Sequence, residues 1–249
     1  MNYIPTTSSL WYKIAIAQFK PQLGNKPANL DSICSYVKQA AMSKAKLIVF
    51  PEMANSGYIF NSRREVLKLA ETPQGDTFEE LSALAKKHSI YIVYGYPELS
   101  ADLIYNSQNL IDCNGKLVCT YRKINLYRND LNWSERGNRG YITQDTEFGK
   151  LGLGICMDMN FDNFTNFHIE GQVDIVAISS CWLEGFDSTL KYWLDRWEKF
   201  QGIIAIANIN GIEQSYIFSG HSCLIEKNKI VAHAHNNSEG LIITEHQYA

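Results

Sequence analysis

Three residues whose types can carry out acyl transfer, Glu52, Lys123 and Cys156, each follow a stretch with the pattern of a β-strand. A carboxylate can act as a general base, a thiolate is a nucleophile, and an ammonium group can stabilise a developing oxyanion. In open α/β sheets, ligands bind beyond the carboxyl ends of the strands. If these three strand ends converge, the set is chemically sufficient for nucleophilic attack on a carbonyl group.

Cys156 ends the clearest of these strands. Over residues 150–155, leucine and isoleucine alternate with Gly152 and Gly154, which is the period of a strand. Glycines in a strand indicate a close approach by another backbone or by a ligand. Polar residues from Asp158 onward are typical of a turn and a helix start, where backbone N–H groups can stabilise an anion. The alternative is an inert buried thiol, since free cysteine is among the most buried residue types.

The two charged residues also have structural interpretations. Glu52 follows the apolar residues 46–50 and could be a carboxylate at a helix start. Lys123 follows residues 117–122 and could be a solvated loop charge. The three residues therefore predict catalysis only as a set.

The elements that must position these residues are strands and helices mixed throughout the chain. Strand patterns cover residues 13–19, 46–50, 91–96, 105–112, 116–121, 173–179, 202–207, 216–225 and 229–234. Helical spacing of apolar residues predicts three helices: one from Leu30 to Ala41, one that begins at Asp76, and one over residues 190–200. Asp76 and Glu79 resemble a capping box at the start of the second helix. Asn114-Gly115 and Gly149-Lys150 indicate hairpin turns. The chain is predicted to be a layered α/β fold in a single domain, residues 1–249, with a flexible extension over residues 1–11.

Composition and charge argue against two classes of binding partner, nucleic acids and membranes. The 249 residues are 45% hydrophobic and 20% charged, with a formal net charge of -3. No Lys/Arg-rich block indicates nucleic acid, and no apolar run is long enough to span a membrane. The polar start lacks the features of a signal peptide, and the six scattered cysteines contain no CxxC pair. We therefore expect a reduced, cytoplasmic protein that binds neither nucleic acid nor membrane.

Other candidate sites are weaker. His233 and His235 could share one face of a strand as metal ligands, but no third ligand is evident, and a pair on an edge strand is the alternative. The segment from Ser219 to Ser222 lacks the GxSxG frame of a nucleophile elbow. Three tryptophans could line a pocket or belong to the core: Trp182, Trp193 and Trp197.

Three segments contain the three candidate catalytic residues: Phe50-Pro-Glu-Met-Ala-Asn-Ser-Gly-Tyr58, Tyr121-Arg-Lys-Ile-Asn-Leu-Tyr127 and Gly154-Ile-Cys-Met-Asp-Met-Asn160. Together they resemble the motifs of the nitrilase (carbon–nitrogen hydrolase) superfamily, in the family's order of Glu, Lys and Cys. The resemblance implies a four-layer αββα sandwich, commonly assembled as a homodimer or larger oligomer. It also implies an amidase that uses no cofactor and no metal.

Site roles follow from the same resemblance. It implies that Glu52 is the general base, Lys123 the oxyanion stabiliser and Cys156 the nucleophile, with the backbone N–H of Met157 as second oxyanion donor. A second glutamate often lies in the loop after the family's lysine, and Glu135 is the best match.

The motifs look most like those of protein N-terminal Asn/Gln amidases, so the expected substrate is the side-chain amide of an N-terminal Asn or Gln. Asp158 is expected either to bind the substrate's α-ammonium group or to cap the following helix. Three alternatives stay open: a small-molecule amidase of the ω-amidase or N-carbamoyl type, a papain-like enzyme with a histidine near the thiol, and a non-enzymatic binding protein on the same fold.

Overall fold

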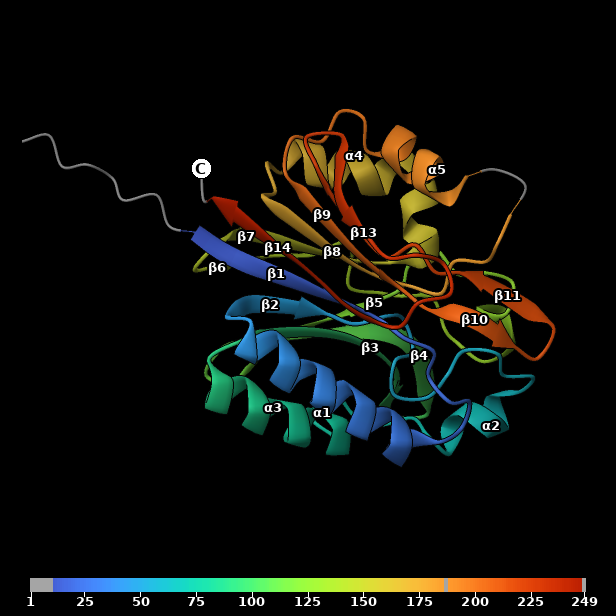
Figure 1. Ribbon diagram of the computed structural model, residues 1–249. Helices are drawn as coiled ribbons and strands as arrows, with labels where there is room; N and C mark the ends of the chain where they lie inside the picture. Colours follow the sequence, from blue (N-terminus) through green and yellow to red (C-terminus); the bar gives the residue numbers. More distant parts are fainter. Residues whose placement is uncertain (1–10, 186–187, 248–249) are drawn as a thin grey trace, which may run out of the picture.

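Two β-sheets lie face to face in the computed structural model, which describes residues 11–185 and 188–247, and helices cover the outer face of each (Figure 1). The layers therefore follow the order helix, sheet, sheet, helix, which confirms the predicted αββα sandwich. Of the expected N-terminal extension, residues 1–10 lie outside the described residues, whereas Trp11 begins the first strand.

The first sheet has six strands in the order β14-β1-β2-β3-β4-β5. Their bounds are β1 (Trp11–Gln18), β2 (Ala45–Val49), β3 (Tyr91–Ser100), β4 (Leu103–Ile111), β5 (Leu117–Arg122) and β14 (Gly240–Gln247). β1, β2 and β3 are parallel, and β4 is antiparallel to both β3 and β5, so β5 runs in the direction of β2. Helices α1 (Lys26–Met42) and α3 (Asp76–His88) cover this sheet (Figure 1).

The second sheet also has six strands, in the order β13-β12-β9-β8-β7-β6. Their bounds are β6 (Thr143–Thr146), β7 (Gly149–Ile155), β8 (Ile175–Ser180), β9 (Ile203–Asn208), β12 (Cys223–Glu226) and β13 (Lys229–His233). β7, β8 and β9 are parallel. Helices α4 (Asp162–Glu170) and α5 (Thr189–Arg196) cover the outer face of this sheet. The remaining elements are short: α2 (Arg63–Leu67), the hairpin of β10 (Asn210–Glu213) and β11 (Tyr216–Ser219), and the 3-10 turns η1 (Asp130–Asn132) and η2 (Cys156–Asn160).

In the strand before Cys156, β7, packing against the two neighbouring layers determines which face carries large side chains and which carries glycine. Leu151, Leu153 and Ile155 are fully buried in the core between the sheets. On the other face, a Cβ at Gly152 would collide with the ring of His168, and one at Gly154 with the ring of Phe164, both from α4. The close approach predicted from these glycines is therefore made by helix side chains, and not by a ligand or another backbone.

Several local predictions were wrong. Residues 216–225 are two strands, because Gly220 and His221 take positive φ angles of 59° and 56° and turn the chain from the β10–β11 hairpin into the second sheet. The N-cap of α3 is Gly75 and makes no side-chain cap, so the capping box expected at Asp76 does not form. α2, β10 and β14 were not predicted; β14 pairs with β1 over more than 200 intervening residues, which no local pattern signals.

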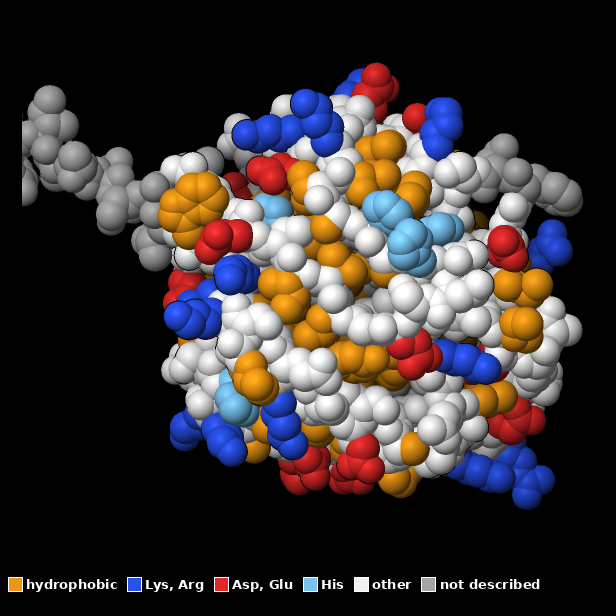
Figure 2. Space-filling view, in the orientation of Figure 1, with side chains coloured by type: hydrophobic (Ala, Val, Ile, Leu, Met, Phe, Trp, Pro, Cys, Tyr) orange, Lys and Arg blue, Asp and Glu red, His pale blue; other side chains and the backbone are white. Residues whose placement is uncertain are grey.

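The surface carries charges of both signs. On the face shown in Figure 2, Lys and Arg side chains are interspersed with Asp and Glu and form no extended basic patch. Within the described residues, no helix combines the length and the apolar character needed to cross a membrane.

Candidate active site

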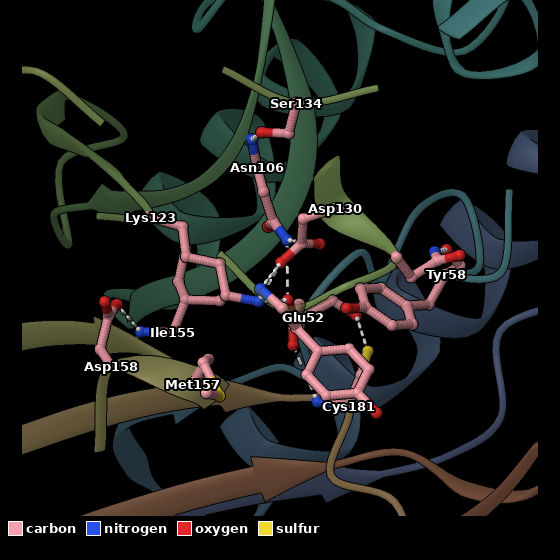
Figure 3. A network of polar contacts seen from close by, with 12 residues as sticks. Glu52, Tyr58, Asn106, Lys123, Asp130, Ser134, Ile155, Met157, Asp158 and Cys181 are labelled. Carbon is pink, nitrogen blue, oxygen red and sulfur yellow. Dashed lines mark hydrogen bonds and ion pairs between the residues drawn. The ribbon is translucent and has the colours of Figure 1, made fainter. Parts of the chain in front are cut away.

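Four strand ends from both sheets meet at one edge of the sandwich. Glu52 and Lys123 follow β2 and β5 of the first sheet, while Cys156 and Cys181 follow β7 and β8 of the second. Because β2 and β5 run in the same direction, their carboxyl ends lie at the same edge. The Glu52 Oε1 atom lies 2.6 Å from the Lys123 Nζ atom, and both side chains are fully buried (Figure 3).

A second carboxylate lies against the same ammonium group. The Oδ2 atom of Asp130, on η1, lies 2.7 Å from the Lys123 Nζ atom and also accepts the N–H of Tyr127 at 2.8 Å. Asn106, on β4, donates from Nδ2 to Glu52 at 2.7 Å and to Asp130 at 3.1 Å (Figure 3). The lysine is therefore held from two sides in a water-excluded site.

Neither Asp130 nor Asn106 was predicted. A short acid in a polar loop is an ordinary turn residue, and Asp130 does stabilise its own turn through the N–H of Tyr127. The sequence signal for Asn106 is weak, because it is one of four consecutive polar residues, Asn106 to Asn109, in this strand.

Glu135 does not occupy the place expected of the second acid. Its side chain is exposed, while its backbone N–H donates to the carbonyl of Ile104 at 2.8 Å. After η1 the chain runs alongside β4, forming a bridge between Glu135 and Tyr105, and this directs the Glu135 carboxylate to solvent. The acid next to Lys123 is Asp130 instead.

Burial and neighbouring charges oppose one another at Glu52. Burial raises the pKa of its carboxyl group, the Lys123 charge lowers it, and the Asp130 charge raises it again. The net direction is upward from the ordinary value of 4.5. Its second oxygen, Oε2, accepts the backbone N–H of Cys181 at 3.0 Å. A carboxyl group with a raised pKa binds a proton more readily than an exposed one, as a group that acts as both base and acid requires.

Lys123 keeps its positive charge. Burial alone would lower its pKa, but Asp130 and Glu52 hold the pKa well above the ordinary value. The Nζ atom also lies 5.8 Å from the ring centroid of Tyr58. This ammonium is therefore a permanent cation next to the pocket.

Cys156 lies at a sharp turn between β7 and η2. Its φ angle is +40°, a left-handed conformation that is uncommon for a residue with a side chain and that clusters at functional sites. Burial raises the pKa of its thiol, the Glu52 carboxylate raises it further, and Lys123 acts in the opposite direction. The thiol is therefore protonated at rest and needs a base. Met157 follows in the first turn of η2, where backbone N–H groups lack partners within the helix.

Asp158 is fully buried and turned away from Glu52 (Figure 3). Its carboxylate accepts the backbone N–H groups of Ile155 and Asn125, both at 3.0 Å, the side-chain amide of Asn125, and the hydroxyl of Tyr121 at 2.8 Å. The expectation that it faces the substrate does not agree with this placement. Its carboxylate stabilises the turn that carries Cys156 and connects it to the segment after Lys123.

A pocket of about 270 Å³ opens in front of the thiol. Its lining includes Tyr58, Tyr127, Cys156, Met157, Trp182 and Glu184. A larger cavity of about 400 Å³ lies near the start of β1 and β9, at the opposite edge, and is lined by none of the three predicted catalytic residues. We therefore assign the candidate active site to the smaller pocket.

The loop that carries Tyr58 is held by a buried carboxylate. Glu213 accepts the N–H of Tyr58 at 3.0 Å and that of Ile59 at 2.5 Å. Of the three tryptophans, Trp182 lines the pocket, whereas Trp193 and Trp197 are fully buried beneath the second sheet.

The other candidate sites lie elsewhere. His233 is on β13, an edge strand of the second sheet. Among the residues that the structure describes, no group of three His, Cys, Asp or Glu side chains is arranged to hold a metal ion. No histidine of the described chain lines the pocket, so the arrangement that a papain-like enzyme requires is not found there.

Comparison with known proteins agrees with this geometry. Residues 13–249 match the carbon–nitrogen hydrolase family model. A probable nitrilase of Schizosaccharomyces pombe is 30% identical over 92% of this chain and 86% of its own length. A protein N-terminal amidase of the same yeast is 26% identical over 86% and 91% of the two chains, and human ω-amidase NIT2 is 28% identical over 85% and 75%.

Solved structures of the same fold include an N-terminal amidase with an Asn-Glu-Ala peptide. It superposes with a TM-score of 0.86 over 96% of this chain and 98% of its own, at 18% identity. The match of the family model over nearly the whole length establishes that the chain belongs to the carbon–nitrogen hydrolase family.

Proposed function

We propose that the protein is a thiol amidohydrolase that cleaves a primary amide to an acid and ammonia through a thioester on Cys156. The observation that supports this most strongly is the 2.6 Å contact between Glu52 and Lys123, fully buried and next to the pocket that Cys156 lines. A base, a cation and a nucleophile in this arrangement would suffice for acyl transfer from an amide bound in the pocket.

Acylation begins with the protonated thiol. Glu52 takes the proton from Cys156 as the sulfur attacks the amide carbon, and the carbonyl oxygen becomes an oxyanion. The Lys123 ammonium and the Met157 N–H donate to that oxyanion. When the tetrahedral intermediate collapses, the C–N bond breaks, and Glu52 returns its proton to the departing ammonia. Burial raises the pKa of Glu52, so its carboxyl group holds the proton of the thiol more readily than an exposed carboxyl would and can return it to the leaving ammonia.

Deacylation reuses the same groups. Glu52 takes a proton from water as the water oxygen attacks the thioester carbon, and Lys123 again stabilises the oxyanion. The C–S bond then breaks, and the proton returns from Glu52 to the sulfur. Asp130 is a positioning residue in this scheme, because its carboxylate, 2.7 Å from the lysine, holds the ammonium group in place.

The substrate we propose is the side-chain amide of an N-terminal Asn or Gln in a peptide. The motif resemblance, the N-terminal amidase relative and the superposed peptide-bound neighbour support this assignment. The ω-amidase relative favours a second candidate, a small acyl amide. The homodimer and the cytoplasmic location implied by sequence stay predictions.

Ammonia release tests the proposal. The purified protein is incubated with Asn- and Gln-initiated dipeptides and with small neutral amides, alongside the variants Cys156→Ala and Cys34→Ala. We expect ammonia from the dipeptides with the wild type and with Cys34→Ala, whose site lies on α1, and none with Cys156→Ala. Release from small amides alone would favour the second candidate. Release from no amide would contradict catalysis and favour a binding protein.

A further inference from the structure

The described lining of the pocket in front of Cys156 contains an acidic side chain but no basic one. Of its described lining residues, Glu184 alone is an aspartate or glutamate. No lysine or arginine of the described chain lines it. The pocket wall therefore presents a carboxylate to the ligand and no cation.

The nearest cation does not reverse this balance. The Lys123 ammonium is paired with both Glu52 and Asp130, at 2.6 and 2.7 Å. Carboxylates thus outnumber ammonium groups around the reacting centre even before Glu184 is counted. An acyl group that carries its own carboxylate would meet repulsion from these like charges, whereas an ammonium group would be attracted.

Glu184 is also held in a defined place. Its backbone N–H donates to the carbonyl of Ile217 at 2.8 Å, and the carbonyl of Trp182 accepts the N–H of Ser219 at 2.9 Å, so the segment runs along β11. Leu183 forms a bridge with Phe218 between them. The segment starts at Cys181, whose N–H binds Glu52, and Glu184 lies three residues farther on, at most about 11 Å along an extended chain.

The Glu184 side chain has no ion-pair partner among the described residues. It is exposed at the pocket, and none of the salt bridges of the described chain includes it. An exposed carboxylate usually faces only water, but this one belongs to the wall of the pocket that holds the nucleophile.

We propose that Glu184 determines specificity by pairing with the α-ammonium group of the substrate, so that the enzyme prefers amides with a free amine near the scissile bond over neutral and anionic ones. This inference rests on the proposed amidase function. It assigns to Glu184 the role that the sequence suggested for Asp158, whose carboxylate is fully occupied by backbone and side-chain donors.

The test compares the dipeptide Asn-Ala, its N-acetyl derivative and succinamate, an amide with a carboxylate in place of the amine. We measure kcat/KM by ammonia release for the wild type, Glu184→Gln, Glu184→Lys and the control Glu198→Gln, an exposed carboxylate outside the pocket. We expect the free-to-acetylated ratio to fall about fivefold in Glu184→Gln, the upper range for a solvent-exposed ion pair. The control should keep the wild-type ratio.

Two further measurements extend the test. In Glu184→Lys, kcat/KM should be higher for succinamate than for Asn-Ala, the reverse of the wild-type order. The wild-type preference for the free amine should weaken at high salt, because exposed charges are screened. A wild-type preference for free amines that persists in both Glu184 variants would overturn this inference and leave the amidase function standing. Equal wild-type rates on all three amides would also overturn it, whereas no ammonia from any of them would contradict the proposed function itself.

Discussion

Replacing Lys123 with methionine removes the cation that two fully buried carboxylates share. Glu52 and Asp130, which lie 2.6 and 2.7 Å from the lysine nitrogen, would then face the same water-excluded space with no counter-charge. Removing one partner of a buried ion pair typically costs about 3–5 kcal/mol of unfolding free energy. For a chain of this size, at roughly 2–4 °C per kcal/mol, the Tm should fall by about 6–20 °C.

The loss of stability should depend on pH in a defined direction. Burial already raises the pKa of Glu52, and the variant removes the Lys123 charge that lowers it, while the Asp130 charge remains. A group whose pKa is raised in the folded state contributes stability below its unfolded pKa, and this contribution is lost as the pH rises through the folded pKa. The Tm deficit should therefore be largest near neutral pH and shrink as the pH falls toward the ordinary value of 4.5.

Thermal denaturation followed by circular dichroism measures this deficit between about pH 5 and pH 8. The matched control is the double variant Lys123→Met/Asp130→Asn, which leaves one buried carboxylate instead of two and should regain part of the lost Tm. Under the same conditions kcat should fall about 100- to 1,000-fold, the usual effect of losing one oxyanion donor. A Tm deficit that does not change with pH, together with no recovery in the double variant, would refute this reasoning.

Three further predictions follow from the site. The value of kcat/KM should rise with pH through a midpoint above 4.5, because Glu52 must be ionised to act as a base and burial raises its pKa; a midpoint at or below that value in a pH–rate profile would contradict this. Asp130→Asn should lower kcat roughly 10- to 100-fold through the loss of a charge-assisted hydrogen bond to Lys123. Glu135→Gln, at an exposed site, should retain activity. Steady-state kinetics in which the two variants behave alike would reject Asp130 as the acid that positions Lys123. Asp158→Asn should slow alkylation of Cys156 by iodoacetamide, because one of the two acceptor oxygens becomes an NH2 group that faces another hydrogen-bond donor and disturbs the turn. An unchanged alkylation rate would argue against that role.

The residues that sequence predicted well are those that end a strong local pattern. Glu52 and Lys123 each follow an apolar strand, and the direction of those strands brings both residues to one edge of the same sheet. Their location at one edge follows from the strand directions, whereas their contact also depends on two long side chains reaching across the ends of β3 and β4, which lie between β2 and β5. Cys156 follows a strand with a clear period, although its left-handed φ angle is set by the turn and not by that period.

The residues that sequence missed depend on loop geometry or on long-range packing. Asp130 and Glu135 lie in one aperiodic loop, and only the turn at η1 decides which acid points to Lys123. Asp158 looked available for a substrate because its burial arises from Tyr121 and Asn125, far away in sequence. Contacts of this kind depend on tertiary structure, which neither periodicity nor propensity contains.

The central claim is that the acyl group is carried by Cys156, and the pocket offers a second thiol, Cys181, that makes the claim testable. The protein is mixed with an Asn-initiated peptide, quenched in acid during turnover and digested, and the modified peptide is located by mass spectrometry. We predict an acyl adduct on the peptide that contains Cys156, and its loss in Cys156→Ala. An adduct on Cys181, or turnover with no adduct on either thiol, would contradict the mechanism.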